Sequence, residues 1–370
     1  MRNVGNRGAN LSALRDHNAA VVLGLLRDAG PEGASRAELA AAAGLTPQAV
    51  SKISARLKEA GLAAGAGRRA STGGKPATAL SLVPDAAHAV GLHLDRDTVT
   101  TVLADLSGTV VAARTAPLAF GAGAGPVLDT VTAEVRTLLA DAGPDPATVL
   151  GAGAAAPGPL DHRTGVLHRV TGFPEWDGFP LRDALGERLA LPVALDKDTN
   201  AAALALAPRG PRAGGSFAYL HLGTGLGAGL VLGGAVHRGA RTGAGEFGHQ
   251  VLQLDGPPCR CGDRGCLEAL CLAAVAGGDT ARAARLLGVG AANLVRLLDI
   301  DHVVLGGRTV LAAPDAYAAG VRAVLPPSVP VAVTPAGDRT VATGAAELVL
   351  APLFGASPGQ KDEGLPRGTD

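Results

Sequence analysis

The chain has to build its interior almost without aromatic side chains. Among 370 residues there are six Phe, two Tyr, one Trp and one Met, although 47% of the residues are hydrophobic. Ala, Val and Leu must therefore fill the core, and such small side chains favour closely packed helices and sheets over aromatic-anchored sandwiches. The hydrophobic content excludes a disordered chain, and 53 Gly without a Gly-X-Y period exclude collagen. The length predicts two or three domains.

Charge is unevenly distributed along the chain. The formal net charge is zero, yet residues 1–80 contain 11 Lys and Arg against five Asp and Glu, and the rest carries the opposite excess. A basic end on an acidic body is typical of a nucleic-acid-binding head joined to a separate domain. Random scatter of surface charge is the alternative.

The basic end has the pattern of three short helices. Apolar residues follow helical spacing over 11–28. Ser35, with a Glu three positions later, forms a capping-box start for a helix over 36–43. Thr46 is a good N-cap and is followed by Pro, so a third helix is expected over 46–61. Helices joined by a Gly-containing turn predict a helix-turn-helix, with a plain helical bundle as the alternative.

The third helix and the segment after it supply candidate DNA-binding side chains. Residues 62–82 hold a Gly-Gly turn among basic residues, which predicts a β-hairpin wing. Gln can bond an adenine edge, Lys or Arg a guanine edge or a phosphate, and Ser a backbone oxygen. We therefore predict a winged helix-turn-helix over 1–82 that binds double-stranded DNA, with contacts from Thr46, Gln48, Ser51, Lys52 and Arg56 on the helix and Arg68, Arg69 and Lys75 on the wing.

Strand-like runs alternate with helical segments in the rest of the chain. This alternation predicts an α/β domain over 83–355, and the polar, Pro- and Gly-rich residues 356–370 predict a disordered tail. The expected strands cover 99–106, 108–112, 149–155, 191–195, 217–222, 226–232 and 302–305, with a helix over 127–142.

No segment has the pattern of a secretory signal or a membrane span. The first apolar run, 19–26, is short and lies inside a helical pattern. Residues 213–237 form the longest stretch without Asp, Glu, Lys or Arg, but eight glycines divide it into a buried hairpin. We expect a cytoplasmic protein without a membrane partner.

The four cysteines gather between positions 259 and 271, which does not suit a disulfide framework for a chain of this length. Three of them follow a histidine in a Gly-rich string. Three thiolates and an imidazole satisfy the tetrahedral preference of zinc, and four protein ligands make such a site structural. We predict zinc on His249, Cys259, Cys261 and Cys266, with Cys271 an ordinary packed side chain; three unrelated buried thiols are the alternative.

The string GEFGH at 245–249 followed by CRCGDRGCLE at 259–268 closely resembles the signature of the ROK family of repressors, open reading frames and sugar kinases. Further matching strings are GAGAAAPGPLD, DKDTNAAAL, LGTGLGAG, VVLGG and GAAELVL. RDHN, SRAELA, GLTPQAVSK and STGGKP resemble the winged helix-turn-helix of the repressor branch. The resemblance implies a two-lobed, actin-like (ribonuclease-H-like) domain with the zinc motif at 249–266, in a homodimer or homotetramer.

The resemblance also implies which parts of the interlobe cleft have changed. Family kinases hold ATP phosphates on two Gly-bearing turns, and the second survives as LGTGLGAG. Where the first has Asp-x-Gly-Gly-Thr, this chain has His93, Asp95, Arg96 and Asp97 around a Leu, which should repel and obstruct a triphosphate. We therefore expect no kinase activity and no other catalysis.

The sugar side is better preserved. Asp198 matches the family's general base, here a vestigial one, while Glu246, His249 and Glu268 match residues that contact sugar hydroxyls. Lys197 stands where the family usually has an Asn. Its ammonium is expected either to pair with Asp198 or to point into the cleft and favour an anionic sugar.

Three functions follow from these patterns. The leading prediction is a transcriptional regulator, most simply a repressor, that responds to a carbohydrate or sugar phosphate in a kinase-like cleft. The second is an ATP-dependent sugar kinase with an added DNA-binding domain. The third is a regulator that has lost its ligand and answers to a protein partner.

Overall fold

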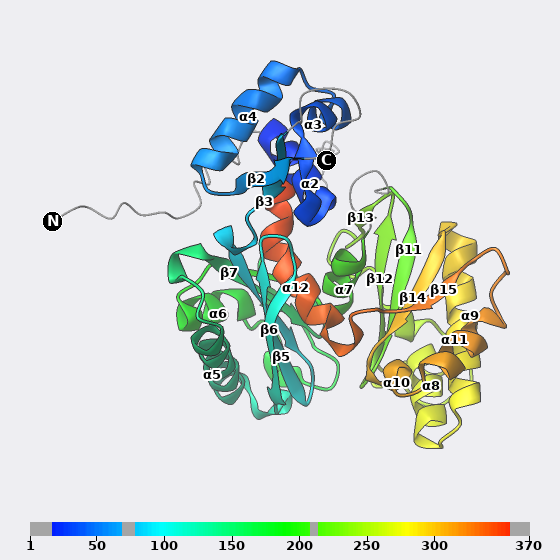
Figure 1. The fold of residues 1–370 in the computed structure, drawn as a ribbon. Coiled ribbons are helices and arrows are strands. Elements are labelled where there is room, and N and C mark those ends of the chain that lie inside the picture. The colour runs from blue at the N-terminus through cyan, green and yellow to red at the C-terminus, as the bar shows by residue number, and fades with distance from the viewer. Residues whose placement is uncertain (1–16, 69–77, 208–213, 356–370) are drawn as a thin grey trace, which may run out of the picture.

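A computed structural model describes the chain over residues 17–68, 78–207 and 214–355. Figure 1 shows a small head above two lobes, which lie on either side of a central helix drawn in red. Lobe 1 contains strands β4 to β10 and lobe 2 contains strands β11 to β15. The predictions for residues 1–16, the wing tip at 69–77 and the tail at 356–370 lie outside the described residues.

The head contains the predicted helices. α2 (His17–Ala29) precedes α3 (Arg36–Ala43) and α4 (Pro47–Glu59). Ser35 forms the expected capping box, and the Thr46 hydroxyl accepts a hydrogen bond from the backbone at the start of α4. Between them the chain turns at a glycine with φ 64°, a left-handed conformation that glycine adopts without strain.

The predicted hairpin follows α4. β2 (Ala63–Arg68) and β3 (Thr78–Leu82) pair antiparallel, and β1 (Ala34–Ser35) adds to the other edge of β3. The three helices and this small sheet form a winged helix-turn-helix arrangement.

The head packs directly against lobe 1. One hydrophobic cluster contains Leu23 and Leu57 of the head, Ala104 of lobe 1 and Leu350, the last residue of the helix over 340–350. A buried ion pair joins Arg27 of α2 to Glu347, with Nη2 and Oε1 2.5 Å apart. The last strand of the head ends at Leu82, and the hydrophobic core continues from the head into lobe 1.

Lobe 1 is a five-stranded mixed sheet in the order β10-β7-β4-β5-β6. Two helices cover one face of it, and Trp176 stacks on Phe120 beneath them. The elements are β4 (His88–Leu94), β5 (Thr98–Asp105), β6 (Val110–Pro117), α5 (Ala124–Ala142), β7 (Val149–Ala156), α6 (Leu181–Leu189) and β10 (Val193–Lys197).

Two predicted strands are shifted. The strand expected over 108–112 is β6, which continues to Pro117. In this edge strand half-buried and exposed residues alternate, so a search for hydrophobic runs did not detect its second half. The strand expected over 191–195 begins two residues later, since Pro192 has no N–H for the ladder and the first parallel pair joins Val193 to Ala152.

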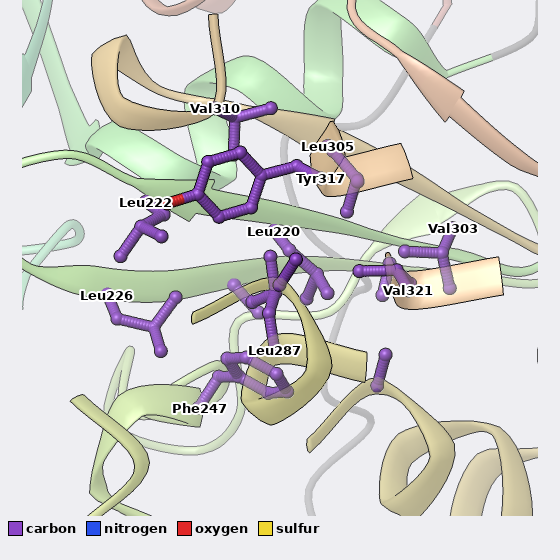
Figure 2. Packing of buried hydrophobic residues seen from close by; sticks show 14 of the residues in the cluster. Leu220, Leu222, Leu226, Phe247, Leu287, Val303, Leu305, Val310, Tyr317 and Val321 are labelled. Carbon is purple, nitrogen blue, oxygen red and sulfur yellow. The ribbon is translucent and has the colours of Figure 1, made fainter. Parts of the chain in front are cut away.

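Lobe 2 is a second five-stranded sheet, in the order β13-β12-β11-β14-β15, and its first two long strands form the predicted hairpin. Figure 2 shows the aliphatic core between this sheet and its helices, including Leu220, Phe247 and Leu287. The elements are β11 (Phe217–Leu222), β12 (Leu226–Leu232), β13 (Ala235–Val236), α8 (Leu267–Ala276), α9 (Thr280–Leu298), β14 (His302–Gly306), α10 (Arg308–Ala312), α11 (Pro314–Arg322) and β15 (Val331–Val333).

Two small-residue helices join the lobes. α7 (Asp198–Leu206) packs against α12 (Thr340–Leu350), the red helix of Figure 1. A Cβ on Gly344 would lie 1.7 Å from the Ala201 carbonyl oxygen, and one on Gly153 equally close to α12. The Ala- and Gly-rich composition therefore lets backbones approach closely at the centre of the molecule. Within the described residues, every helix is too short or too polar to cross a bilayer.

Candidate ligand cleft and metal centre

A polar cleft lies where the two lobes meet. Its cavity volume is about 90 Å³. Lobe 1 contributes Asp95 and Arg96, the start of α7 contributes Asp198, and lobe 2 contributes Glu246 and Glu268.

The predicted base position is held at a helix start. Asp198 is the first residue of α7 and follows β10 directly, so its carboxylate projects from the end of a parallel strand. One oxygen accepts a hydrogen bond from the Thr199 backbone at 2.6 Å. Glu268 is buried and accepts the Leu226 backbone N–H at 2.8 Å. Glu268 therefore fixes the second Gly turn beneath the cleft.

Lys197 corrects one of our predictions. Its Nζ lies 2.6 Å from Glu246 Oε1 and also donates to the Ala244 carbonyl at 3.0 Å, so the ion pair expected with Asp198 is not the one formed. The reason is the strand: Lys197 ends β10 and Asp198 begins α7, so neighbouring side chains diverge. The ammonium does line the cleft, but Glu246 neutralises it.

Ion pairs join the turn after β4 to lobe 2. Asp97, in the turn after β4, receives two hydrogen bonds from Arg308 of lobe 2, at 2.7 and 2.9 Å. Asp95 accepts from the Thr224 hydroxyl at 3.1 Å and lies 3.7 Å from Arg308. These contacts cross between the lobes at the turn where the kinases carry their first phosphate-binding glycines.

Two titratable groups at this turn are perturbed. Burial lowers the pKa of His93. Burial would raise the pKa of Asp95, but His93, the Arg96 backbone N–H and Arg308 together hold it below its ordinary value. An ionised Asp95 is therefore part of the resting cleft. Arg96 extends from the same turn into the cleft, with its guanidinium 5.3 Å from the centre of the Phe173 ring.

The predicted metal ligands come together. One ligand atom from each of His249, Cys259, Cys261 and Cys266 lies within 4.8 Å of the others. The sulfurs of Cys261 and Cys266 are 3.7 Å apart, and so are Cys259 Sγ and His249 Nδ1. Two sulfurs at tetrahedral positions 2.3 Å from zinc would lie roughly 3.8 Å apart, so the cluster fits that ion.

The loop that carries the thiols is folded for this arrangement. The Cys259 backbone N–H donates to the Asp263 carbonyl, and Gly265 adopts φ 68° against the Gln253 carbonyl. Burial raises the pKa of the Cys266 thiol to about 12, so a thiolate there requires a cation. Cys271 is buried in the core of lobe 2, as expected of a packed thiol.

The predicted DNA-contacting residues of the third helix are all exposed. Gln48, Ser51, Lys52 and Arg56 lie along α4, and Thr46 caps it. Arg68 ends β2, while Arg69 and Lys75 fall outside the described residues. The sequence did not single out Arg308 or Thr224 as cleft residues, although Arg308 directly follows the VVLGG string that marked the strand.

A two-lobed, sugar-kinase-like domain with a winged helix-turn-helix head defines the class of this protein. The chain belongs to the ROK family, whose family model matches residues 89–276. The ROK hexokinase from Thermus thermophilus is 31% identical, with a TM-score of 0.57, covering 73% of this chain and 97% of that one.

Repressors are among the relatives as well. The xylose repressor of Caldicellulosiruptor bescii is 28% identical over 240 residues, covering 63% of this chain and 59% of the repressor's length. A ROK transcriptional regulator described as a homologue of E. coli Mlc shares the fold, with a TM-score of 0.70 at 21% identity, over 92% of this chain and 98% of that structure.

Proposed function

We propose that this chain is a DNA-binding transcriptional repressor whose cleft binds a small carbohydrate and transfers no phosphate. The observation that carries the proposal is the pairing of Asp95 and Asp97 with Arg308 at the turn that the resemblance equates with the kinases' first phosphate-binding turn. A bound triphosphate would have to displace these pairs and would meet two carboxylates. The groups on the sugar side remain arranged around the cleft, and the polar face of α4 is exposed to solvent.

The sugar side suits several hydroxyl groups. The Asp198 carboxylate can accept hydrogen bonds and the His249 imidazole can donate one. The Glu246 side chain is 40% exposed despite its bond to Lys197. Without a nucleotide, Asp198 would orient a hydroxyl and would not activate it. The proposed effector is a monosaccharide or its phosphate ester.

We infer a structural zinc ion on the His249 cluster. All four protein ligands would be used, which leaves no open position for catalysis. When bound, zinc would supply only cross-linking and charge. His249 also lines the cleft, so the metal loop would hold that imidazole in place for the sugar.

A connected path supports coupling between cleft and head. α12 packs on α7, which begins at Asp198, and Glu347 of α12 is paired with Arg27 of α2. We propose that effector binding alters the position of the heads in a homodimer or homotetramer and thereby their fit to two half-sites. The two domains proposed are residues 1–82 and 83–355.

The repressors among the relatives support this function, whereas the hexokinase keeps a second candidate in view. A sugar kinase would share the same sugar-side groups, but it would have to bind ATP at the turn after β4, where Asp95 and Asp97 are paired with Arg308. Incubating the purified chain with ATP, magnesium and a panel of hexoses separates the two, because the repressor proposal predicts no sugar-dependent ADP release.

The decisive test is a gel shift with DNA flanking the chain's own gene, repeated with sugars and sugar phosphates. Lys52→Ala should reduce the salt dependence of binding by about 0.9 in log–log slope, since one phosphate contact is lost. Gln48→Ala should change sequence preference. Arg136→Ala, an exposed cation of lobe 1, is the matched control. Absence of specific binding to any fragment, with the protein folded and metal-loaded, would overturn the proposal.

A further inference from the structure

A second and much larger hollow lies outside the cleft. Its cavity volume is about 1030 Å³, and it shares no lining residue with the cleft. It lies between the edge strand β10 of lobe 1 and the edge strand β13 of lobe 2, and we call it the edge groove. Leu232, Val236 and Leu348 provide apolar wall, while the polar groups come from both lobes.

A buried arginine presents its free end to the edge groove. Arg238 is 8% exposed, and its Nε donates to Asp196 Oδ2 at 2.6 Å. Within the part of the chain that the structure describes, its two terminal nitrogens have no hydrogen-bond partner, although the residue lines the groove. The Asp196 carboxylate is occupied, because its other oxygen accepts from Asn200 and from the Lys197 backbone. The guanidinium is therefore held through Nε, and its two terminal nitrogens can donate hydrogen bonds to an oxyanion.

A histidine beside this arginine is held in one orientation. His162 Nδ1 lies 2.7 Å from the Thr242 hydroxyl, which also accepts the His162 backbone N–H. Which of the two atoms donates in the Nδ1 contact depends on the tautomer of the ring, and Nε2 is the nitrogen without a partner among the described residues. His162 lines the groove and lies close enough to Arg238 and Asp196 to interact electrostatically with both.

The residue that orients the histidine is under backbone strain. Thr242 is buried and has φ 56°, a left-handed conformation that is unfavourable for a β-branched side chain. Such strain costs about 1–3 kcal/mol and persists at sites where the surrounding structure requires it. Thr242 is connected to the groove through its contact with His162.

Two more cations stand at the rim. Arg163 donates to the Ala240 carbonyl across the lobes, and Arg182 of α6 donates to the Arg163 carbonyl. Each also has a carboxylate nearby, Asp161 and Asp183 respectively, so the rim attracts anions less strongly than the buried Arg238.

We propose that the edge groove is a second ligand site, which binds the phosphate group of a small organic phosphate through Arg238 and His162. A planar guanidinium and an imidazole that can donate through Nε2 match the several acceptor oxygens of a phosphate. The apolar wall and the volume accommodate the organic part of the molecule. The site is separate from the carbohydrate cleft and does not depend on the function proposed for it.

The test is calorimetric titration of the full chain with inorganic phosphate, glucose 6-phosphate, acetate and glucose. Both phosphates should bind, and His162→Ala should weaken them about tenfold or more, the effect of losing one strong hydrogen bond. Arg182→Ala should weaken binding less. Arg188→Ala is the matched control on the same helix, since Arg188 pairs with Asp129 away from the groove and should leave binding unchanged.

The cleft variant Asp198→Asn separates the two sites, because phosphate binding in the groove should survive it while a cleft ligand is lost. The doubly changed Arg238→Gln, Asp196→Asn protein removes the buried pair together and should abolish phosphate binding while circular dichroism confirms folding. Equal binding of phosphate by native and His162→Ala protein, tighter binding of acetate than of phosphate, or no binding of either phosphate would overturn the proposal. Failure here would leave the gel-shift outcome unaffected.

Discussion

The two sides of the cleft have diverged in opposite ways. On the side of the turn after β4, carboxylates are bonded to groups of lobe 2: Asp97 to Arg308 and Asp95 to the Thr224 hydroxyl. On the sugar side, the acidic groups line the cleft together with His249, which also belongs to the cysteine cluster. The comparison teaches that charged groups around one cleft can be paired with the protein on one side and left open to a ligand on the other.

The largest effect should come from the metal cluster. Cys259→Ser, or removal of the metal by a chelator, should lower the melting temperature by about 10 °C, because a structural zinc contributes several kcal/mol to the folded state. Metal analysis should give about one equivalent in the native protein. Cys271→Ala is the control that removes a buried thiol and keeps the metal. An unchanged melting temperature in metal-free protein would show that the loop does not depend on the ion.

The next effect concerns the pair between Lys197 and Glu246. Glu246→Gln leaves a buried ammonium without its charge partner, and after allowance for the exposure of Glu246 we expect a loss of about 2 kcal/mol in unfolding free energy. Urea denaturation measures it. Adding Lys197→Met should recover most of the loss, since the uncompensated charge is then gone. If the single variant is as stable as the native chain, the pair is only incidental.

A smaller effect is expected on ligand affinity. Lys197→Asn restores the family's usual residue and frees Glu246 to accept a sugar hydroxyl. Neutral hexoses and pentoses should then bind about tenfold tighter, the effect of one additional hydrogen bond to a charged group. Calorimetry of native and variant protein decides this. Weaker binding of neutral sugars by the variant would mean that Lys197 itself contacts the ligand.

The smallest effect belongs to the interlobe ion pairs. Arg308→Ala should cost at most about 1 kcal/mol, because the arginine and Asp97 are both substantially exposed. It should not create ATP binding, since the carboxylates remain. A nucleotide that binds this variant and not the native chain would make Arg308 the main obstacle.

The pH dependence of the same turn has a definite sign. The pKa of Asp95 is below its ordinary value in the folded state, so its contribution is fully present above about pH 4. It is lost as the pH falls through the folded-state value. In Asp95→Asn the unfolding free energy should therefore fall less steeply as the pH is lowered than in the native chain, as measured by urea denaturation between about pH 3 and 5.

Local sequence signals were sufficient for the helices of the head and for the clustering of His249 with three cysteines. Ser35 and Thr46 fix where helices start because capping involves residues only a few positions apart. The cysteines and His249 are close in sequence and are joined by glycines that permit tight turns. The small-residue composition also predicted the close packing found between α7 and α12.

Only the tertiary structure decided which charges meet. Lys197 and Asp198 are adjacent in the chain, yet the change from strand to helix separates their side chains and brings Lys197 to Glu246. Arg308 reaches Asp97 across more than 200 positions, and Arg238 and His162 line one groove although they are far apart in the sequence. Ion pairing depends on distances of a few ångströms, which hydrophobic periodicity does not specify.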